Sequence, residues 1–160
     1  SFQLRGDNRI TFPEGIPFHR LTDMDGPWPY KGKTNYTFPH DHGYQYRGYR
    51  LNKEKRPTFL YHYGDISVED YFEDALDEKG KAYFKRTMTF NTTAPQEKFY
   101  FRVASGKKIT SAQNGWQIDS LKLHLSGASG GEIRHGDPQE LLIPITLPAG
   151  KTTLHLEYRW

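Results

Sequence analysis

The chain has 160 residues, which suits one domain with a hydrophobic core of its own. Its 22 Lys and Arg against 19 Asp and Glu give a net charge of only +3, without the basic cluster that a nucleic-acid surface needs. The absence of Cys excludes disulfides, thiolate metal sites and covalent attachment of c-type haem within the chain, and no apolar run of about 18 residues is present to span a membrane.

Residues 1–43 are rich in Pro, Gly and aromatic residues and show little periodicity. Short strands are possible at residues 9–12 and 17–21, and residues 26–33 combine turn residues with bulky side chains. Aromatic residues recur from position 28 to position 44, which argues against disorder. We therefore expect residues 1–43 to form an ordered arm that packs on the following domain.

Residues 44–160 alternate apolar and polar side chains with the period of two that is typical of half-buried β-strands. The alternating runs are short, and clusters of Gly, Pro, Asn and Ser separate them as turns. The clearest runs are residues 44–51, 58–63, 82–90, 99–103, 121–125, 141–147 and 154–160. This pattern predicts an all-β domain over residues 44–160, built as a two-layer antiparallel β-sandwich with the arm packed on it.

A few positions within these runs break the simple pattern. The apolar phase shifts at Gly48, which suggests a β-bulge, and Pro144 implies an edge or a bulge because proline lacks a backbone donor. Arg86 falls on an apolar row, where a guanidinium needs a carboxylate partner unless a bulge turns it outward. The partner could come from Asp65, Glu69 or Asp70.

Residues 66–78 are ambiguous. Val68, Tyr71 and Phe72 have helical spacing, but acidic residues repeat at positions i and i+4, which disfavours a helix. We expect a strand through about Tyr71 followed by an acidic loop, with a short helix as the alternative. Carboxylates here could bind calcium or act as a glycosidase acid and base, but no EF-hand pattern is present and no pair stands out. A solvated acidic rim is the simpler interpretation.

Short motifs of a distinctive kind are spread over most of the chain. They include Arg47-Gly48-Tyr49-Arg50-Leu51, Arg56-Pro57-Thr58-Phe59, Tyr63-Gly64-Asp65, Val68-Glu69-Asp70, Lys85-Arg86-Thr87, Phe99-Tyr100-Phe101-Arg102, Gly106-Lys107-Lys108-Ile109, Asn114-Gly115-Trp116, Glu140-Leu141-Leu142-Ile143-Pro144 and Tyr158-Arg159-Trp160. Together they resemble a β-sandwich module of large bacterial extracytoplasmic multidomain proteins. Those proteins combine a β-propeller of the quinoprotein sugar-dehydrogenase type with c-type cytochrome domains.

This resemblance implies a periplasmic or secreted location and a chain that is one part of a larger protein. The chain begins at Ser1 without a signal peptide and ends within a strand-like pattern, so we expect a domain of a longer polypeptide. In that family haem ligation and propeller chemistry belong to neighbouring domains. The chain has no Cys-x-x-Cys-His motif, and we expect no cofactor within it.

Aromatic residues in loops and at strand starts are candidates for carbohydrate binding. Aromatic faces stack on sugar rings, while nearby polar side chains bond to the hydroxyl groups. The candidates are Trp28, Tyr30, Tyr36, Tyr44, Tyr46 and Trp116. The alternative is that these rings fill the sandwich core or clamp the arm, because aromatic side chains dominate core packing.

His40 and His42 are candidates for a metal site. On an extended chain two residues at i and i+2 point the same way, and neutral imidazoles suit zinc, copper or iron. A third ligand would have to come from another segment, such as His62 or Asp65. A polar, hydrogen-bonded loop is the alternative, since no recognised metal-binding spacing is present.

We expect a non-catalytic accessory module that packs against, orients or extends neighbouring domains of a multidomain periplasmic quinoprotein or c-type cytochrome protein. The first alternative is a carbohydrate-binding module, which predicts aromatic side chains exposed together on one face. The second is an enzyme that uses a metal or paired carboxylates, which predicts a deep pocket lined by the histidines or by acidic residues. The expected partners are neighbouring domains and, in the first alternative, carbohydrate; nucleic acid and a membrane span are not expected.

Overall fold

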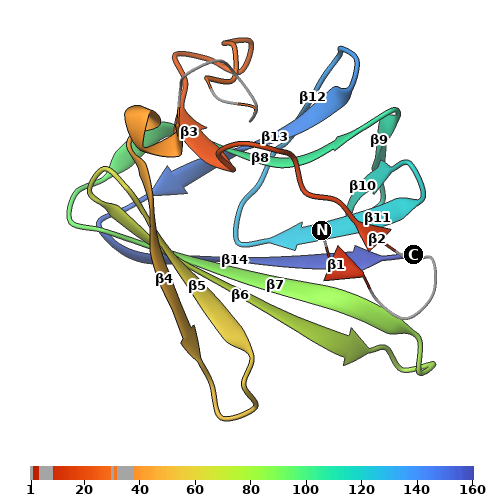
Figure 1. The fold of residues 1–160 in the computed structure, drawn as a ribbon. Helices are drawn as coiled ribbons and strands as arrows, with labels where there is room; N and C mark the ends of the chain where they lie inside the picture. The colour runs from red at the N-terminus through yellow and green to blue at the C-terminus, as the bar shows by residue number, and fades with distance from the viewer. Residues whose placement is uncertain (1, 4–8, 30, 32–37) are drawn as a thin grey trace.

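The computed structural model describes residues 2–3, 9–29, 31 and 38–160, and nearly all of its regular structure is β-strand. In this part of the chain two antiparallel sheets, of eight and four strands, pack face to face around one main core (Figure 1). The predicted all-β class and two-layer antiparallel sandwich are thereby confirmed. A short 3-10 turn, η1 (Pro39–His42), precedes the first strand of the larger sheet.

The larger sheet has the strand order β4-β5-β6-β7-β14-β11-β10-β9. Its strands are β4 (Tyr44–Leu51), β5 (Pro57–Tyr63), β6 (Ile66–Leu76), β7 (Ala82–Thr92), β14 (Gly150–Arg159), β11 (Leu121–Ser126), β10 (Gly115–Ile118) and β9 (Ile109–Ala112). Each strand runs antiparallel to its neighbours. β14 is last in the sequence but lies in the middle of the sheet, between β7 and β11.

The smaller sheet has the strand order β12-β13-β8-β3. Its strands are β12 (Glu132–Arg134), β13 (Gln139–Leu147), β8 (Gln96–Gly106) and β3 (Phe18–Arg20), and a separate pair joins β1 (Phe2–Gln3) to β2 (Arg9–Ile10). Pro144 lies in β13 beyond residues 140–142, which are the ones that β12 pairs with. Its missing donor therefore costs no hydrogen bond to β12, in agreement with the expected edge position.

Apolar rows from the two facing sheets form the core. The rows include Met88, Phe90, Leu154 and Leu156 from the larger sheet and Phe99, Phe101, Ile143 and Ile145 from the smaller one, all at most 3% exposed. Full burial of each such side chain contributes about 1.5–3 kcal/mol. The alternation of apolar and polar residues that predicted the strands therefore also predicts which face is buried.

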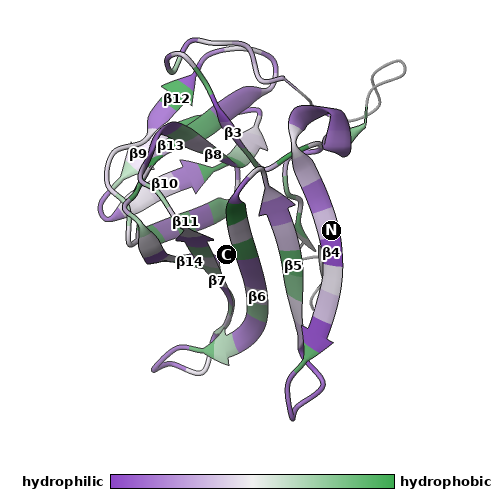
Figure 2. Ribbon diagram, turned by 90° about the vertical axis from the view of Figure 1, so that its left-hand side faces the viewer, coloured by the Kyte–Doolittle hydropathy of each residue, from purple (hydrophilic) through white to green (hydrophobic). Residues whose placement is uncertain are grey.

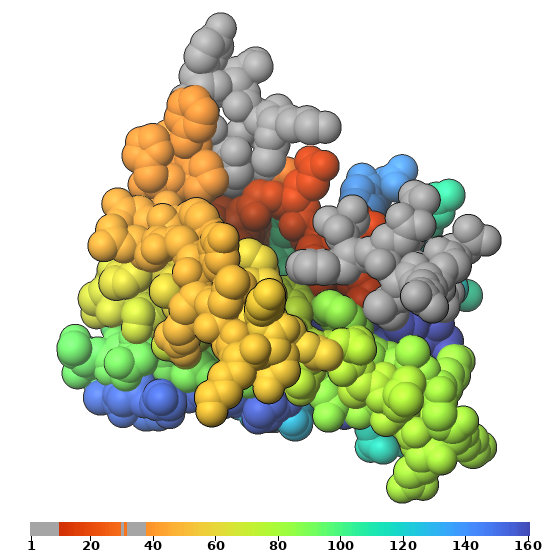
Figure 3. Space-filling view, turned by 60° about the horizontal axis from the view of Figure 1, so that its bottom comes forward, coloured from red at the N-terminus to blue at the C-terminus, as the bar shows by residue number. Residues whose placement is uncertain are grey.

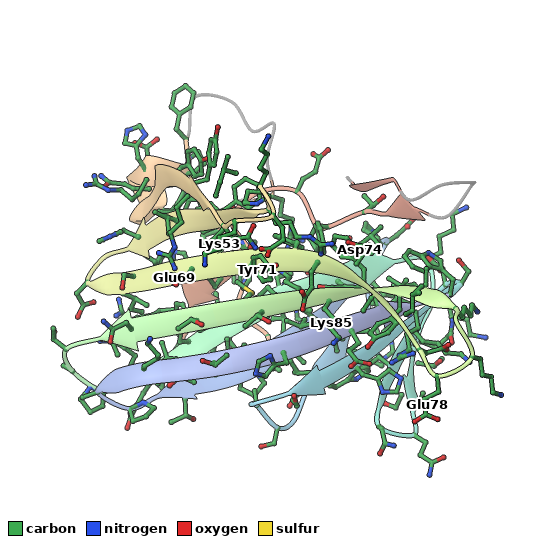
Figure 4. The ribbon with its side chains drawn as sticks, turned by 90° about the horizontal axis from the view of Figure 1, so that it is seen from below. Lys53, Glu69, Tyr71, Asp74, Glu78 and Lys85 are labelled. Carbon is green, nitrogen blue, oxygen red and sulfur yellow. The ribbon has the colours of Figure 1, made fainter. Side chains whose placement is uncertain are left out.

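The outer face of the larger sheet is polar. Glu69 and Tyr71 of β6 and Lys85 of β7 lie on it, as the view from below shows (Figure 4). Glu73 lies directly opposite Lys85 across the two strands, and opposite charges in such pairs are favourable. This face has the mixed polar character of an ordinary solvated sheet surface.

One part of the arm packs on the outer face of the smaller sheet, while Ile10 and Phe18 are buried in the main core. Leu21 and Trp28 pack on that outer face against Tyr100 of β8 and Leu142 of β13. The Trp28 indole also donates a hydrogen bond of 2.9 Å to a backbone carbonyl of the arm itself. β3 belongs to the arm by sequence and pairs with β8, so the arm supplies a strand of the sandwich as well. The boundary expected at residue 43 stays a prediction.

The strand β6 runs to Leu76, so the acidic loop expected after Tyr71 and the alternative helix are both wrong. In a strand, residues four positions apart lie on the same face but roughly 13 Å apart, and adjacent carboxylates point to opposite faces, so the like-charge repeat brings no two carboxylates close together. Most of these carboxylates also meet a guanidinium. The ion pairs are Arg50–Glu69 at 2.6 Å, Arg86–Asp70 at 2.7 Å and Arg56–Asp74 at 2.7 Å.

Candidate functional site

A row of tyrosines runs along the core-side face of β4 and β5. The register of this hairpin pairs Tyr44 with Tyr63, Tyr46 with Tyr61 and Tyr49 with Phe59. Because Tyr63 is buried in the core, the whole row lies on the core side of the sheet. We refer to Tyr44, Tyr46, Tyr49 and Tyr61 as the phenol face.

A β-bulge keeps this row on one face. The pairing of β4 with β5 skips Arg47, so Tyr46 and Gly48 lie opposite consecutive residues of β5. Tyr49 lies three positions after Tyr46, so in a regular strand without a bulge the two side chains would point to opposite faces. Gly48 has a φ of 100°, which other residues adopt only with strain. The predicted bulge at Gly48 is therefore confirmed.

The smaller sheet does not cover the outer part of the phenol face, Tyr46 and Tyr49. Figures 1 and 2 show the β4–β5 hairpin extending past the smaller sheet, and in Figure 3 it forms a block in the foreground (orange to yellow). Tyr46 is 55% exposed and Tyr49 60%, whereas Tyr44 and Tyr61 are half-buried. Leu51, which is 54% exposed, continues the row towards the hairpin turn. The phenol face thus leads from the core to an open surface.

Ring contacts hold the phenol face in place. Tyr44 stacks on Tyr61 with centroids 5.3 Å apart and 28° between the ring planes, and Tyr46 contacts the same Tyr61 ring at 5.6 Å. Tyr44 also lies 5.6 Å from the buried ring of Phe18, which joins the row to the core. Such ring pairs contribute about 0.5–1.5 kcal/mol beyond the burial of their area. The inner rings therefore hold the exposed part of the phenol face in a fixed position.

Burial keeps the inner phenols protonated. It raises the pKa of Tyr61 to about 12, with the nearby Asp70 carboxylate adding to the shift. Burial also raises the pKa of Tyr44, and the neighbouring Tyr61 and Asp70 add to that shift. A protonated phenol can both donate and accept a hydrogen bond. These two hydroxyl groups therefore suit neutral polar groups of a ligand.

A hollow of about 700 Å³ lies at the start of β4. Its lining residues are Phe38, Pro39, His40, Tyr44, Gln45, Tyr46 and Arg47. The exposed ring of Phe38 stacks on the imidazole of His40, with centroids 5.9 Å apart and 16° between the planes. Apolar walls with a few polar groups are typical of ligand sites of this size. The hollow is our candidate binding site, and Tyr44 and Tyr46 of the phenol face line it.

The structure brings together two of the residues that were predicted to bind carbohydrate. Tyr44 and Tyr46 both line the hollow. Trp28 is only 5% exposed and lies on the outer side of the smaller sheet, while Trp116 of β10 packs against the core. These two indoles therefore serve packing, which was the stated alternative. Tyr30 and Tyr36 lie outside the described residues.

The histidines considered as metal ligands are not brought together. His40 and His42 belong to η1, and in a 3-10 turn residues at i and i+2 point in different directions. His40 instead forms an ion pair with Asp41 at 2.9 Å, and His62 is exposed on the outer face of β5. Across residues 2–3, 9–29, 31 and 38–160, no group of three or more His, Cys, Asp or Glu is placed to hold a metal ion.

A second, polar hollow of about 540 Å³ lies where the arm meets β12 and β13. Glu140 lines it, is 6% exposed and forms three ion pairs. Its partners are Lys31 at 2.9 Å, Arg102 at 2.9 Å and Arg134 at 2.6 Å. Lys31 belongs to the arm, and Arg102 and Arg134 belong to the smaller sheet. This cluster therefore fastens the arm to the sheet.

Sequence reasoning missed Tyr49, Tyr61 and Arg47 as binding candidates. Tyr49 and Tyr61 lie inside strands, where aromatic residues usually pack in a core. A usable signal was present, because the phase shift at Gly48 places Tyr49 on the same face as Tyr46. That this face is uncovered depends on the width of the opposite sheet, which no local pattern reveals.

Neither a protein family model nor a curated protein nor a solved structure matches the chain. The similarity to a module of quinoprotein and cytochrome proteins therefore stays an expectation carried by the motifs alone. No helix among the described residues is long and apolar enough to cross a membrane.

Proposed function

We propose that this chain is a non-catalytic accessory module of a multidomain extracytoplasmic protein, and that the phenol face is its binding surface. One observation carries the proposal. Of the five large hydrophobic side chains exposed in the described part of the chain, four lie on β4 or just before η1: Phe38, Tyr46, Tyr49 and Leu51. Exposed apolar groups that gather in one place mark interaction sites, whereas scattered ones do not.

The ligand class that fits this surface best is carbohydrate. A sugar ring has a C–H face that packs on an aromatic ring and hydroxyl groups that need hydrogen bonds at its edge. Tyr46 and Tyr49 supply exposed rings, and Gln45, Arg47 and His40 supply polar groups around the hollow. The stacked pair of Tyr44 and Tyr61 keeps the surface rigid, so little ordering entropy opposes binding.

A second candidate function uses the same surface to pack against a neighbouring domain of the parent protein. Phe38 and Leu51 favour it, because their side chains carry no polar atom that could bond to a sugar hydroxyl. The motif resemblance implies neighbouring domains against which the chain would pack.

The test compares the wild-type chain with a Tyr46→Ala/Tyr49→Ala variant in thermal unfolding with a panel of soluble glycans. A glycan at 100 times its Kd adds about 2.7 kcal/mol to the stability of the wild type, which corresponds to a rise of several degrees in Tm. The variant should lose this rise. Tyr71→Ala is the matched control, because Tyr71 lies on the opposite face of the same sheet (Figure 4).

The outcomes separate the two candidates. If no glycan shifts the Tm, but the double variant weakens association of the chain with the rest of its parent protein, the packing function holds. If neither measurement distinguishes the double variant from Tyr71→Ala, the phenol face is not a binding surface.

A further inference from the structure

The β4–β5 hairpin that carries the phenol face is strongly basic. Between Gln45 and Arg56 it holds one acidic residue, Glu54, against the basic residues Arg47, Arg50, Lys53, Lys55 and Arg56. Arg50 and Arg56 are neutralised by Glu69 and Asp74 of β6. For Arg47, Lys53 and Lys55 the described residues supply no carboxylate within ion-pair distance. The hairpin therefore carries an excess of positive charge, although the chain as a whole is nearly neutral.

Within the hollow itself Arg47 is the group with a permanent charge. No carboxylate is found among the described residues that line the hollow, and His40 is already paired with Asp41. Arg47 is also exposed, so its guanidinium remains available to a ligand. A neutral ligand would leave this positive charge without a partner.

Arg47 and Tyr46 are consecutive residues of the edge strand β4, and both line the hollow. Arg47 is the residue that the pairing of β4 with β5 skips. Gln45 lines the hollow as well, so residues from both faces of this edge strand reach it. The hollow therefore offers a guanidinium and an exposed phenol ring to the same ligand.

We propose that the phenol face takes an acidic polysaccharide, with a uronate carboxylate on Arg47 and the sugar ring on Tyr46. This inference rests on the proposed carbohydrate-binding function and adds the chemical class of the sugar. The planar fork of a guanidinium matches a planar carboxylate and forms charge-assisted hydrogen bonds with it.

The test uses isothermal titration of the full 160-residue chain with polygalacturonate and with its methyl ester. The two polymers have the same sugar backbone, and the ester lacks only the charge. We expect the ester to bind at least about tenfold more weakly than the acid, which is the usual effect of losing a hydrogen bond to a charged group. Arg47→Gln should reduce the binding of polygalacturonate to the level of the ester, and added salt should weaken it.

Arg50→Gln is the matched control, because Arg50 lies on the same strand and is already paired with Glu69. It should bind polygalacturonate like the wild type. Equal binding of acid and ester would overturn the uronate proposal and leave carbohydrate binding intact. Binding of neither polymer, nor of the neutral glycans, would overturn both proposals. Dextran sulfate binding as tightly as polygalacturonate would mean a general polyanion surface and would overturn the assignment to a carboxylate.

Discussion

Arg86 of β7 and Asp70 of β6 form an ion pair that is buried on the core side of the larger sheet. Arg86 is 6% exposed and Asp70 2%, and the guanidinium donates from Nε and Nη2 to the two carboxylate oxygens at 2.8 and 2.7 Å. Aromatic rings surround the guanidinium, with its carbon 4.8 Å from the Phe12 centroid and 4.9 Å from that of Phe72. The bidentate geometry and the rings replace the water that both charges lost on folding.

Removing one member of this pair should be far more damaging than removing an exposed one. Asp70→Ala leaves an uncompensated guanidinium in the core, and we expect it to lower the free energy of unfolding by about 3–5 kcal/mol. Glu69→Ala removes the neighbouring carboxylate, whose pair with Arg50 is exposed, and should cost less than about 1 kcal/mol. Urea unfolding at pH 7 measures both. Similar losses of unfolding free energy in the two variants would show that the buried pair contributes no more to stability than the exposed pair.

At the scale of elements, the arm and the smaller sheet are joined through Glu140. Three cations from three segments converge on this carboxylate: Lys31 from the arm, Arg102 from β8 and Arg134 from β12. Burial by itself would raise the pKa of Glu140, but hydrogen bonds from Lys31 and Arg134 and the charges of Lys31 and Arg102 outweigh it and hold the pKa below its ordinary value. The attachment of the arm therefore depends on pH.

The lowered pKa of Glu140 sets the direction of this dependence. A carboxyl whose pKa is lower in the folded state stabilises the fold above its unfolded pKa of about 4.3, and this stabilisation is lost as the pH falls through the folded value. We expect Glu140→Gln to unfold at lower urea than the wild type at pH 7, and the difference to shrink as the pH drops below about 4.3. A difference that stays constant from pH 7 to pH 3 would contradict this account.

At the scale of the whole molecule, the larger sheet depends on the last strand of the chain. β14 pairs with β7 over residues 150–158 and with β11 over residues 155–159, so it joins the first half of the sheet to β11, β10 and β9. Leu154, Leu156 and Tyr158 of this strand are buried in the core. The sheet is therefore complete only when the C-terminal residues are in place.

Deleting residues 150–160 should abolish cooperative folding. The deletion exposes the facing edges of β7 and β11 and removes the buried side chains of β14, which contribute about 1.5–3 kcal/mol each. Thermal unfolding followed by circular dichroism should show no sigmoidal transition for the shortened chain. His155→Ala, a change at an exposed position of the same strand, should keep the transition of the wild type. A cooperative transition in the shortened chain would mean that the sandwich forms without β14.

The unequal width of the two sheets creates the proposed site. The larger sheet continues through β5 and β4, while the smaller sheet ends at β3. Beyond Tyr44, the aromatic row of β4 is therefore built like a core row, but the described residues place no sheet opposite it. A wider smaller sheet would have turned Tyr46 and Tyr49 into ordinary core residues.

Local patterns in the sequence predicted much of this fold. Period-two alternation identified most of the long strands, Gly48 marked the bulge, and Arg86 on an apolar row required a carboxylate that Asp70 supplies. The short strands β9, β10 and β12 were missed, and the second half of β6 was mistaken for a loop because its charges were given more weight than its spacing. There Asp74 pairs with Arg56 of the turn between β4 and β5, a partner that no pattern within the segment could reveal.

The sequence by itself determined the all-β class and most of the long strands, because side-chain alternation and turn chemistry act between residues close together in the chain. Only the tertiary structure decided which aromatic residues are covered. Trp28 is buried and Tyr46 is exposed, although both looked like candidates for the same role. Exposure depends on what lies across the molecule, and the strands that could cover a ring come from segments far from it in the sequence.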